Sequence, residues 1–253
     1  MTSANAALAA AAFAPALAIG SFLNVVVARL PERRSLVAPR SACPACGHEL
    51  AWWEHVPLLS YALLRGRCHG CSAAIPLRYP LVELATALLV AACFWRFGLS
   101  GDAFVAAFFC ATLVALSAID LERRIIPDRI VLPAAGIVLV AQVGLHPDRA
   151  VEWAVAGLAA SLFLFAALVA YPQGMGMGDV KLALLLGFML GWEVSVGLMA
   201  GFIAGLVPSI VLFARHGLAA RKMKIPFGPF LAVGGLVALF AGEPILSRYL
   251  GLF

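Results

Sequence analysis

Charged residues are scarce in this chain, and acidic residues are the scarcer kind. Only 12% of the 253 residues are charged and only 13 are Asp or Glu, whereas 63% are apolar. The mean hydropathy is +0.99. Soluble globular proteins carry roughly twice this share of charge, about 25%, so the composition excludes that class. It predicts a polytopic membrane protein.

Two sequence signatures are also missing. Residues 1–8 contain no Lys or Arg, and basic residues begin only after Ala28. The Ala-rich start therefore lacks the charged region that opens a cleaved secretory signal, and we expect a first helix that is retained. No glycine-rich Rossmann fingerprint follows a predicted strand, so any nucleotide-type cofactor site must be built from membrane-domain and loop residues.

The apolar stretches are long enough to span a bilayer, which takes about 20 helical residues. They predict an all-α fold of about eight transmembrane helices. The sixth stretch is shorter than a full span and must borrow residues from its neighbours. The predicted spans are 6–28, 79–98, 103–119, 129–145, 150–171, 180–192, 194–214 and 228–246.

The distribution of Lys and Arg predicts the orientation, because basic residues near span ends stay on the cytoplasmic side. With the N-terminus outside, 15 of the 18 Lys and Arg residues fall in inner loops, and Arg96, Arg149 and Arg248 lie outside. The net charge of +5 then follows from topology and indicates no nucleic-acid partner. The inner residues are Arg29, Arg33, Arg34, Arg40, Arg65, Arg67, Arg78, Arg123, Arg124, Arg129, Lys181, Arg215, Arg221, Lys222 and Lys224.

One polar insertion, residues 29–78, follows the first span. It contains two CxxC pairs that are separated by 21 residues. Four thiolates in this arrangement are the ligand set of a tetrahedral structural zinc site. A cytoplasmic location argues against disulfides, since that compartment keeps thiols reduced. We predict a small cytoplasmic zinc-binding domain whose ligands are Cys43, Cys46, Cys68 and Cys71.

The other cysteines and the histidines have simpler interpretations. Cys93 and Cys110 lie in apolar segments without a CxxC partner, so we expect small buried side chains. His48, His55 and His69 could each substitute as a metal ligand, but four cysteines already complete the set.

Two aspartates stand at the ends of apolar segments, where ionised carboxylates are costly. Asp120 closes the third span and Asp179 opens the sixth, so both fall at the cytoplasmic edge. Two neighbouring carboxylates cannot both ionise cheaply, so the pair can hold one proton, activate water and protonate a leaving amine. Gly176 and Gly178 leave room before Asp179 for an extended substrate strand. We predict a catalytic pair formed by Asp120 and Asp179.

A structural interpretation of these acids is the alternative. Asp179 at a helix start complements the helix dipole and could be a cap, whereas Asp120 at a helix end opposes the dipole. Asp128 follows Pro127 and is expected to begin the fourth span. Both interpretations are compatible with the residues alone.

Three further polar residues stand in or beside apolar segments. Lys181 lies two residues beyond Asp179 and should point away from it, toward phospholipid or an incoming acidic group. Asn24 and Glu83 could pack against another helix or contact substrate. Neither interpretation of Asn24 or Glu83 is preferred.

A set of motifs resembles one known family. Gly176-Met177-Gly178-Asp179, with Asp120 and Ile126-Pro127-Asp128, is similar to the GxGD pattern of bacterial type IV prepilin peptidases, which are bifunctional leader peptidases and N-methyltransferases. The ordered set is far more specific than GxGD alone. The other matching segments are 20–26, the two CxxC pairs, 65–68, 78–83 and 225–230.

The resemblance implies that Asp120 and Asp179 are the catalytic aspartates of an intramembrane-type peptidase in the bacterial inner membrane. It implies prepilin and pseudopilin substrates of type IV pili and type II secretion, with a short basic leader cut after Gly at the cytoplasmic face among membrane lipids. It also implies N-methylation of the new N-terminal residue by S-adenosylmethionine. The residues themselves identify neither the S-adenosylmethionine site nor an oligomeric state.

The sequence thus predicts three parts, namely a first helix at 1–28, the zinc-binding domain at 29–78 and a membrane peptidase domain of about seven helices at 79–253. The alternative function is a secondary transporter or ion-coupled carrier, which would also use intramembrane carboxylates and glycine-rich turns. A carrier does not explain the cysteine pairs. It also does not explain two acids at the inner edge rather than near the midplane.

Overall fold

The computed structural model describes residues 3–172, 175–217 and 225–251. Within these residues every regular element is helical, which confirms the predicted all-α fold. The chain forms two compact units, Met1–Ile119 and Asp120–Phe253, and each unit is described by itself. The predicted inner residues Arg221, Lys222 and Lys224 lie outside the described residues.

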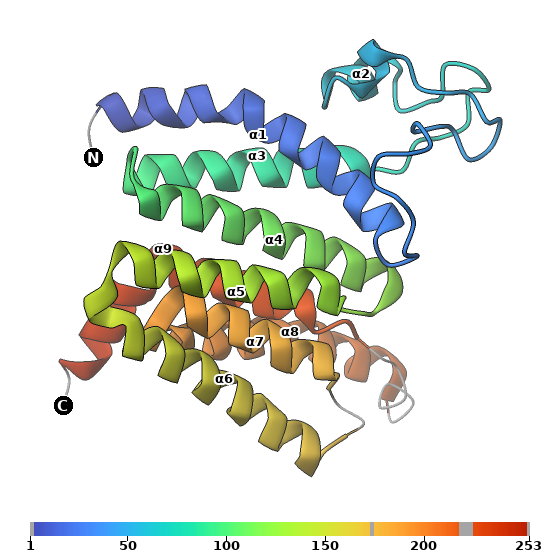
Figure 1. Cartoon of the computed structure of the whole chain (residues 1–253). Coiled ribbons are helices and arrows are strands. Elements are labelled where there is room, and N and C mark those ends of the chain that lie inside the picture. Colours follow the sequence, from blue (N-terminus) through green and yellow to red (C-terminus); the bar gives the residue numbers. More distant parts are fainter. Residues whose placement is uncertain (1–2, 173–174, 218–224, 252–253) are drawn as a thin grey trace. The chain divides into compact units, whose positions relative to one another are not determined.

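The first unit is built on three apolar helices. They are α1 (Ser3–Arg29), α3 (Arg78–Phe97) and α4 (Gly101–Arg123), whose last turn from Asp120 belongs to the second unit. α1 and α3 pack along much of their length and run in opposite directions (Figure 1).

Small side chains let the helices of the first unit approach closely, as is usual where apolar helices pack in lipid. Ala16, Ala87 and Ala103 are completely buried in this core. Cys93 on α3 and Cys110 on α4 are also completely buried, which confirms their predicted role as small core residues.

Between α1 and α3 the chain folds into two short hairpins. Isolated bridges pair Ala42 with Glu49 and Arg67 with Ala74, so each hairpin encloses one CxxC pair. The segment between the hairpins holds two short helical turns, η1 (Trp52–His55) and α2 (Leu59–Leu63). So little regular structure is typical of a module that depends on a metal for folding energy.

Within the described residues, the second unit contains five long helices, which run in alternating directions (Figure 1). α7 is the central helix, since it packs against α5, α6 and α9 and most of its side chains are buried. The elements are α5 (Asp128–Leu145), η2 (Pro147–Arg149), α6 (Ala150–Ala170), α7 (Met177–Leu190), η3 (Gly191–Glu193), α8 (Val194–His216) and α9 (Gly228–Leu250).

The crossing of α6 and α7 depends on two glycines. A Cβ atom added to Gly187 would collide with the backbone of Gly157, and one added to Gly157 would collide with the ring of Phe188. The backbones therefore touch directly, which is how helices associate tightly without a hydrophobic driving force between them.

Seven stretches of the described residues are long and apolar enough to cross a membrane, and one of them, Met177–Arg215, contains both α7 and α8. The eight long helices match the eight predicted spans in order. α7 has 14 residues and is about 21 Å long at 1.5 Å per residue, shorter than the roughly 30 Å hydrocarbon core. The sixth helix borrows residues 177–179 at its start, as predicted, but it ends at Leu190 and stays shorter than a full span.

Candidate active site and metal centre

Asp120 lies in the last turn of α4 and is buried, with 5% of its surface exposed. Its Oδ2 accepts a hydrogen bond from the backbone N–H of Gly228 at 3.0 Å. Gly228 is the first residue of α9, and N–H groups at a helix start have no partner within their own helix. The positive end of the α9 dipole therefore stabilises a carboxylate that the end of α4 disfavours.

Asp179 is the third residue of α7 and is also buried, with 8% of its surface exposed. Its Oδ2 accepts the N–H of Gly176 at 3.0 Å. This bond is the carboxylate half of a capping box, so one oxygen of Asp179 has the capping role that the sequence allowed. Asp179 lies in the same compact unit as Asp120.

The side chain of Ile126 lies beside both Gly178, which precedes Asp179, and Gly228, which bonds to Asp120. A Cβ atom at Gly178 would lie 2.8 Å from Cβ of Ile126, and one at Gly228 would lie 3.1 Å from its Cδ1. The Gly228 position is tighter still, since the added Cβ would be 2.8 Å from Oδ2 of Asp120. Glycine is thus required for close approach at both positions, and Ile126 fills the space beside Gly178 that the sequence left open for substrate.

Lys181 forms an ion pair beside this site. Its Nζ lies 2.6 Å from Oδ1 of Asp128, which is the first residue of α5. The prediction that Asp128 begins the fourth span is confirmed. The acidic partner of Lys181 in this ion pair is Asp128, not Asp179. The prediction that Lys181 faces phospholipid or an incoming acid is wrong, because Asp128 supplies the acidic partner across the α5–α7 contact.

Asn24 and Glu83 hold elements of the first unit together. The Asn24 side-chain amide donates to the carbonyl of Tyr79 at 3.1 Å. A carboxylate oxygen of Glu83 accepts the N–H of Leu58 at 2.9 Å. Both residues are buried, so of the two interpretations the structure favours packing between elements.

The four predicted metal ligands come together. The Sγ atoms of Cys43, Cys46, Cys68 and Cys71 all lie within 4.8 Å of one another. The two cross-hairpin pairs are Cys43 with Cys71 at 3.8 Å and Cys46 with Cys68 at 3.9 Å. Sulfur atoms that each bind a central zinc at about 2.3 Å in a tetrahedron are separated by nearly this distance. The cluster can hold a metal ion.

Backbone N–H groups and neighbouring thiols shift the pKa values of two cysteines in the cluster. The N–H groups of Ala45 and Cys46 lower the pKa of Cys43 to about 6, so this thiol is ionised at neutral pH. The N–H of His48 lowers the pKa of Cys46, but Cys71 and the other crowded thiols raise it by more, to about 12. Without a cation, one thiol of the cluster ionises readily, whereas ionisation of a second thiol is opposed. A divalent metal ion would stabilise the additional thiolates.

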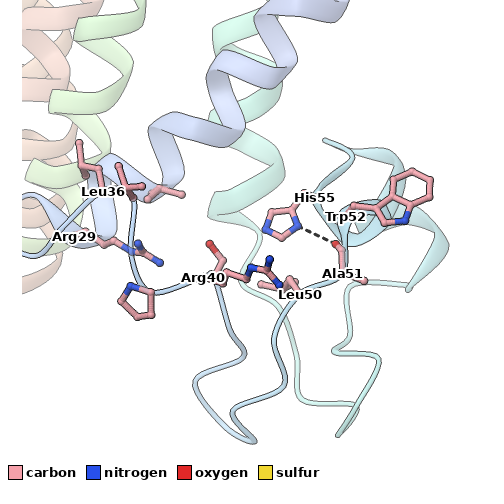
Figure 2. A pocket seen from close by; sticks show the side chains of 11 residues that line it. Arg29, Leu36, Arg40, Leu50, Ala51, Trp52 and His55 are labelled. Carbon is pink, nitrogen blue, oxygen red and sulfur yellow. Dashed lines mark hydrogen bonds between the residues drawn. The ribbon is translucent and has the colours of Figure 1, made fainter.

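A basic pocket of about 590 Å³ lies beside the end of α1 (Figure 2). Its lining includes Arg29, Arg40, His55 and Trp52, together with apolar side chains and without any acidic residue. S-adenosylmethionine carries a positive sulfonium, a positive ammonium and one negative carboxylate, so two guanidinium groups would attract the carboxylate but repel both cations. The pocket residues therefore do not fit that cofactor, and no step is assigned to it.

Comparisons with known proteins agree with this arrangement. Residues 15–97 match the bacterial Peptidase A24 N-terminal domain, and residues 107–220 match the Type IV leader peptidase family. The chain is 40% identical to a Prepilin leader peptidase/N-methyltransferase of Pseudomonas aeruginosa, over 92% of this chain and 90% of that protein. It is 40% identical to one of Burkholderia pseudomallei strain 1026b, over 90% and 84%, and 38% identical to one of Aeromonas salmonicida, over 92% and 91%.

No solved structure matches the chain. The first family match lies within the first compact unit, and the second runs from residue 107 into the second unit as far as residue 220. The Pseudomonas aeruginosa and Burkholderia pseudomallei relatives match 92% and 90% of this chain. This chain belongs to the type IV prepilin leader peptidase/N-methyltransferase family.

Proposed function

We propose that this chain is a prepilin leader peptidase whose catalytic pair is Asp120 and Asp179. The observation that carries the proposal is that both carboxylates are buried in one compact unit and each accepts a backbone N–H, while Ile126 lies beside both Gly178 and Gly228. Buried acids at span ends are otherwise costly. Family membership favours this function over the carrier that the sequence left as an alternative.

The pair can perform acid–base hydrolysis of a peptide bond. One ionised aspartate takes a proton from water while the other, protonated, donates to the scissile carbonyl, and the proton returns to the leaving amine as the tetrahedral intermediate collapses. Gly176 holds Oδ2 of Asp179 and Gly228 holds Oδ2 of Asp120, and we assign the proton transfers to the two Oδ1 atoms. The backbone bonds fix the orientation that proximity catalysis needs.

We place both aspartates at the cytoplasmic face of the inner membrane, with the N-terminus outside, because 15 of the 18 basic residues then lie inside. A prepilin or pseudopilin has a short basic leader followed by an apolar helix. The positive leader would stay in the cytoplasm while the helix enters the bilayer. The junction between them would then reach the depth of Asp120 and Asp179, where cleavage after Gly takes place.

We propose that residues 29–78 form a zinc-binding domain. The Sγ separations suit tetrahedral Zn²⁺, and the N–H of Gly70 donates to Sγ of Cys68 at 3.4 Å, as expected for a knuckle that presents a thiolate. Zinc would supply about 10 kcal/mol or more toward folding of so small a module. Glu83 would then connect the folded module to α3 through Leu58.

We also propose that the chain methylates the new N-terminal residue, usually Phe, as the names of its relatives suggest. S-adenosylmethionine would supply the methyl group. The basic pocket beside α1 does not complement it, so this half of the proposal is supported by family membership and has no assigned residues.

Coexpression with a client pilin tests both activities at once. Mass spectrometry of the pilin N-terminus distinguishes an uncut leader, a cut and unmodified chain, and a cut and methylated chain. Cut and methylated pilin is expected. A cut pilin without the methyl group would remove the methyltransferase half, and an uncut leader would remove the peptidase.

A further inference from the structure

Three side chains of metal-binding type gather beside the four-cysteine cluster and have no part in the peptidase. Ligand atoms of His48, Glu54 and His69 all lie within 4.8 Å of one another. Nε2 of His48 is 3.1 Å from Oε2 of Glu54. Imidazole nitrogens and a carboxylate oxygen are the ligands that zinc and similar divalent transition metals take.

The hairpins of the cysteine cluster position both histidines. The carbonyl of His48 accepts the N–H of Cys43 at 2.9 Å, which closes the first hairpin. His69 follows Cys68 directly, and the N–H of Cys68 bonds to Ala73 at 2.8 Å in the second hairpin. A metal bound by the four cysteines would therefore hold the two histidine backbones at a fixed separation.

The separation of the two imidazole rings allows both to bind one metal ion. The ring centroids of His48 and His69 are 6.1 Å apart, and a metal bound at about 2 Å from a nitrogen of each ring fits between them. Trp53 packs edge-on against His69, with centroids 5.5 Å apart. This contact restricts the rotation of the more exposed of the two rings.

The carboxylate of Glu54 is buried and held in position by hydrogen bonds. Its side chain is only 2% exposed, and the N–H of Ala51 donates to Oε2 at 2.7 Å. Burial raises the pKa of Glu54, but the bonds from Ala51 and His48 outweigh it and hold the pKa below its usual range. A buried carboxylate needs a charged or hydrogen-bonding partner, and a metal ion shared with two histidines would provide a full positive charge.

We propose that His48, Glu54 and His69 form a second metal site, which binds a divalent transition-metal ion such as Zn²⁺ beside the four-cysteine site. Three protein ligands leave a fourth position open for water. Because His69 is exposed, the ion exchanges with solvent more readily than an ion held by four thiolates. The site is independent of the peptidase proposal, since Asp120 and Asp179 lie in the other compact unit.

Metal stoichiometry of the full-length chain tests this site. The protein, purified in detergent and stripped of metal, is titrated with Co²⁺, whose spectrum reports its ligands. The first equivalent should enter the four-cysteine site and give intense sulfur-to-metal charge transfer. A second equivalent should add weak visible bands without further charge transfer. Elemental analysis after loading with Zn²⁺ should give two ions per chain.

A matched pair of histidine variants assigns the second ion. His69→Asn should bind one equivalent and keep the charge-transfer band, which also verifies that the module is folded. His55→Asn is the control, because His55 lies in the same module but outside the cluster, with Nδ1 against the carbonyl of Ala51; it should bind two. Saturation of the wild type at one ion, or two ions in His69→Asn, would overturn the site and leave a hydrogen-bonded network.

Discussion

The backbone N–H of Gly228 donates to Oδ2 of Asp120 across 108 residues of sequence, at 3.0 Å. The bond joins the first residue of α9 to the last turn of α4. It leaves no room for a side chain, since a Cβ atom at position 228 would lie 2.8 Å from the same oxygen. The start of α9 thus stabilises the ionised form of Asp120 and fixes the position of its carboxylate.

Replacement of either aspartate by Asn should abolish leader cleavage. Asn keeps the size of the side chain but can neither accept nor release the proton at neutral pH, and loss of a positioned acid or base costs about 10²–10⁴-fold or more. Cleavage of a synthetic leader spanning a Gly-Phe junction, by reconstituted Asp120→Asn and Asp179→Asn proteins, measures this. Substantial cleavage by either variant would contradict the pair.

The control for these variants is Asp128→Asn. Asp128 is close in sequence to Asp120 and carries the same chemistry, but it is exposed and pairs with Lys181. An exposed ion pair contributes only about 0–1 kcal/mol. Cleavage should therefore stay within a few-fold of wild type, and a loss as large as that of Asp120→Asn would show that the assay reports damage to the membrane domain.

Gly228→Ala should reduce cleavage by about one to two orders of magnitude while the protein stays inserted. The added methyl group displaces the carboxylate of Asp120, and small misplacements of reacting groups cost about 10²-fold. Gly136→Ala is the control, because nothing lies within 4 Å of a Cβ atom there. Equal activity of the two variants would remove Gly228 from the site.

The sequence predicted the acids of the site but not what holds them. Asp120 and Asp179 are conspicuous because charge is rare at the ends of apolar spans. The contacts of Ile126 with Gly178 and Gly228 have no such local signal, since each residue is apolar or without a side chain. Contacts between segments that are distant in sequence produce no periodic pattern along the chain from which they could be predicted.

The central place of α7 was also beyond prediction. Its length followed from hydropathy, and the structure confirms a short helix. A helix that is apolar on every side can face either lipid or protein, because lipid tails are as apolar as a protein core. Only the glycine contact of Gly187 with Gly157 distinguishes the two, and it requires knowledge of both helices together.

Gly187→Ala should destabilise the second unit by about 1–3 kcal/mol, the usual cost of overpacking. The added methyl group overlaps the backbone of Gly157, and helices α6 and α7 must separate to admit it. Thermal unfolding in detergent, followed by light scattering, would report a lower Tm. Gly144→Ala should leave the Tm unchanged or raise it slightly, since its added Cβ meets nothing within 4 Å and Ala is favoured over Gly within a helix; an equal drop in both would refute the crossing as the cause.

Zinc affinity of the four-cysteine site should rise with pH. At pH 7 Cys43, with a pKa of about 6, is already ionised, whereas Cys46, with a pKa of about 12, keeps its proton until the metal displaces it. Each proton released on binding steepens the dependence by about tenfold per pH unit. Above pH 6 the affinity therefore climbs, and below it protonation of Cys43 weakens binding further.

Competition with a chelator of known affinity, from pH 5.5 to 8, measures this dependence in the full-length chain. The slope should match the number of protons released, which calorimetry in two buffers of different ionisation enthalpy gives independently. Asp179→Asn is the control and should have the same slope, because Asp179 lies in the other compact unit. A pH-independent affinity would mean that the thiols are not the ligands, while loss of zinc in Cys68→Ser would assign them directly.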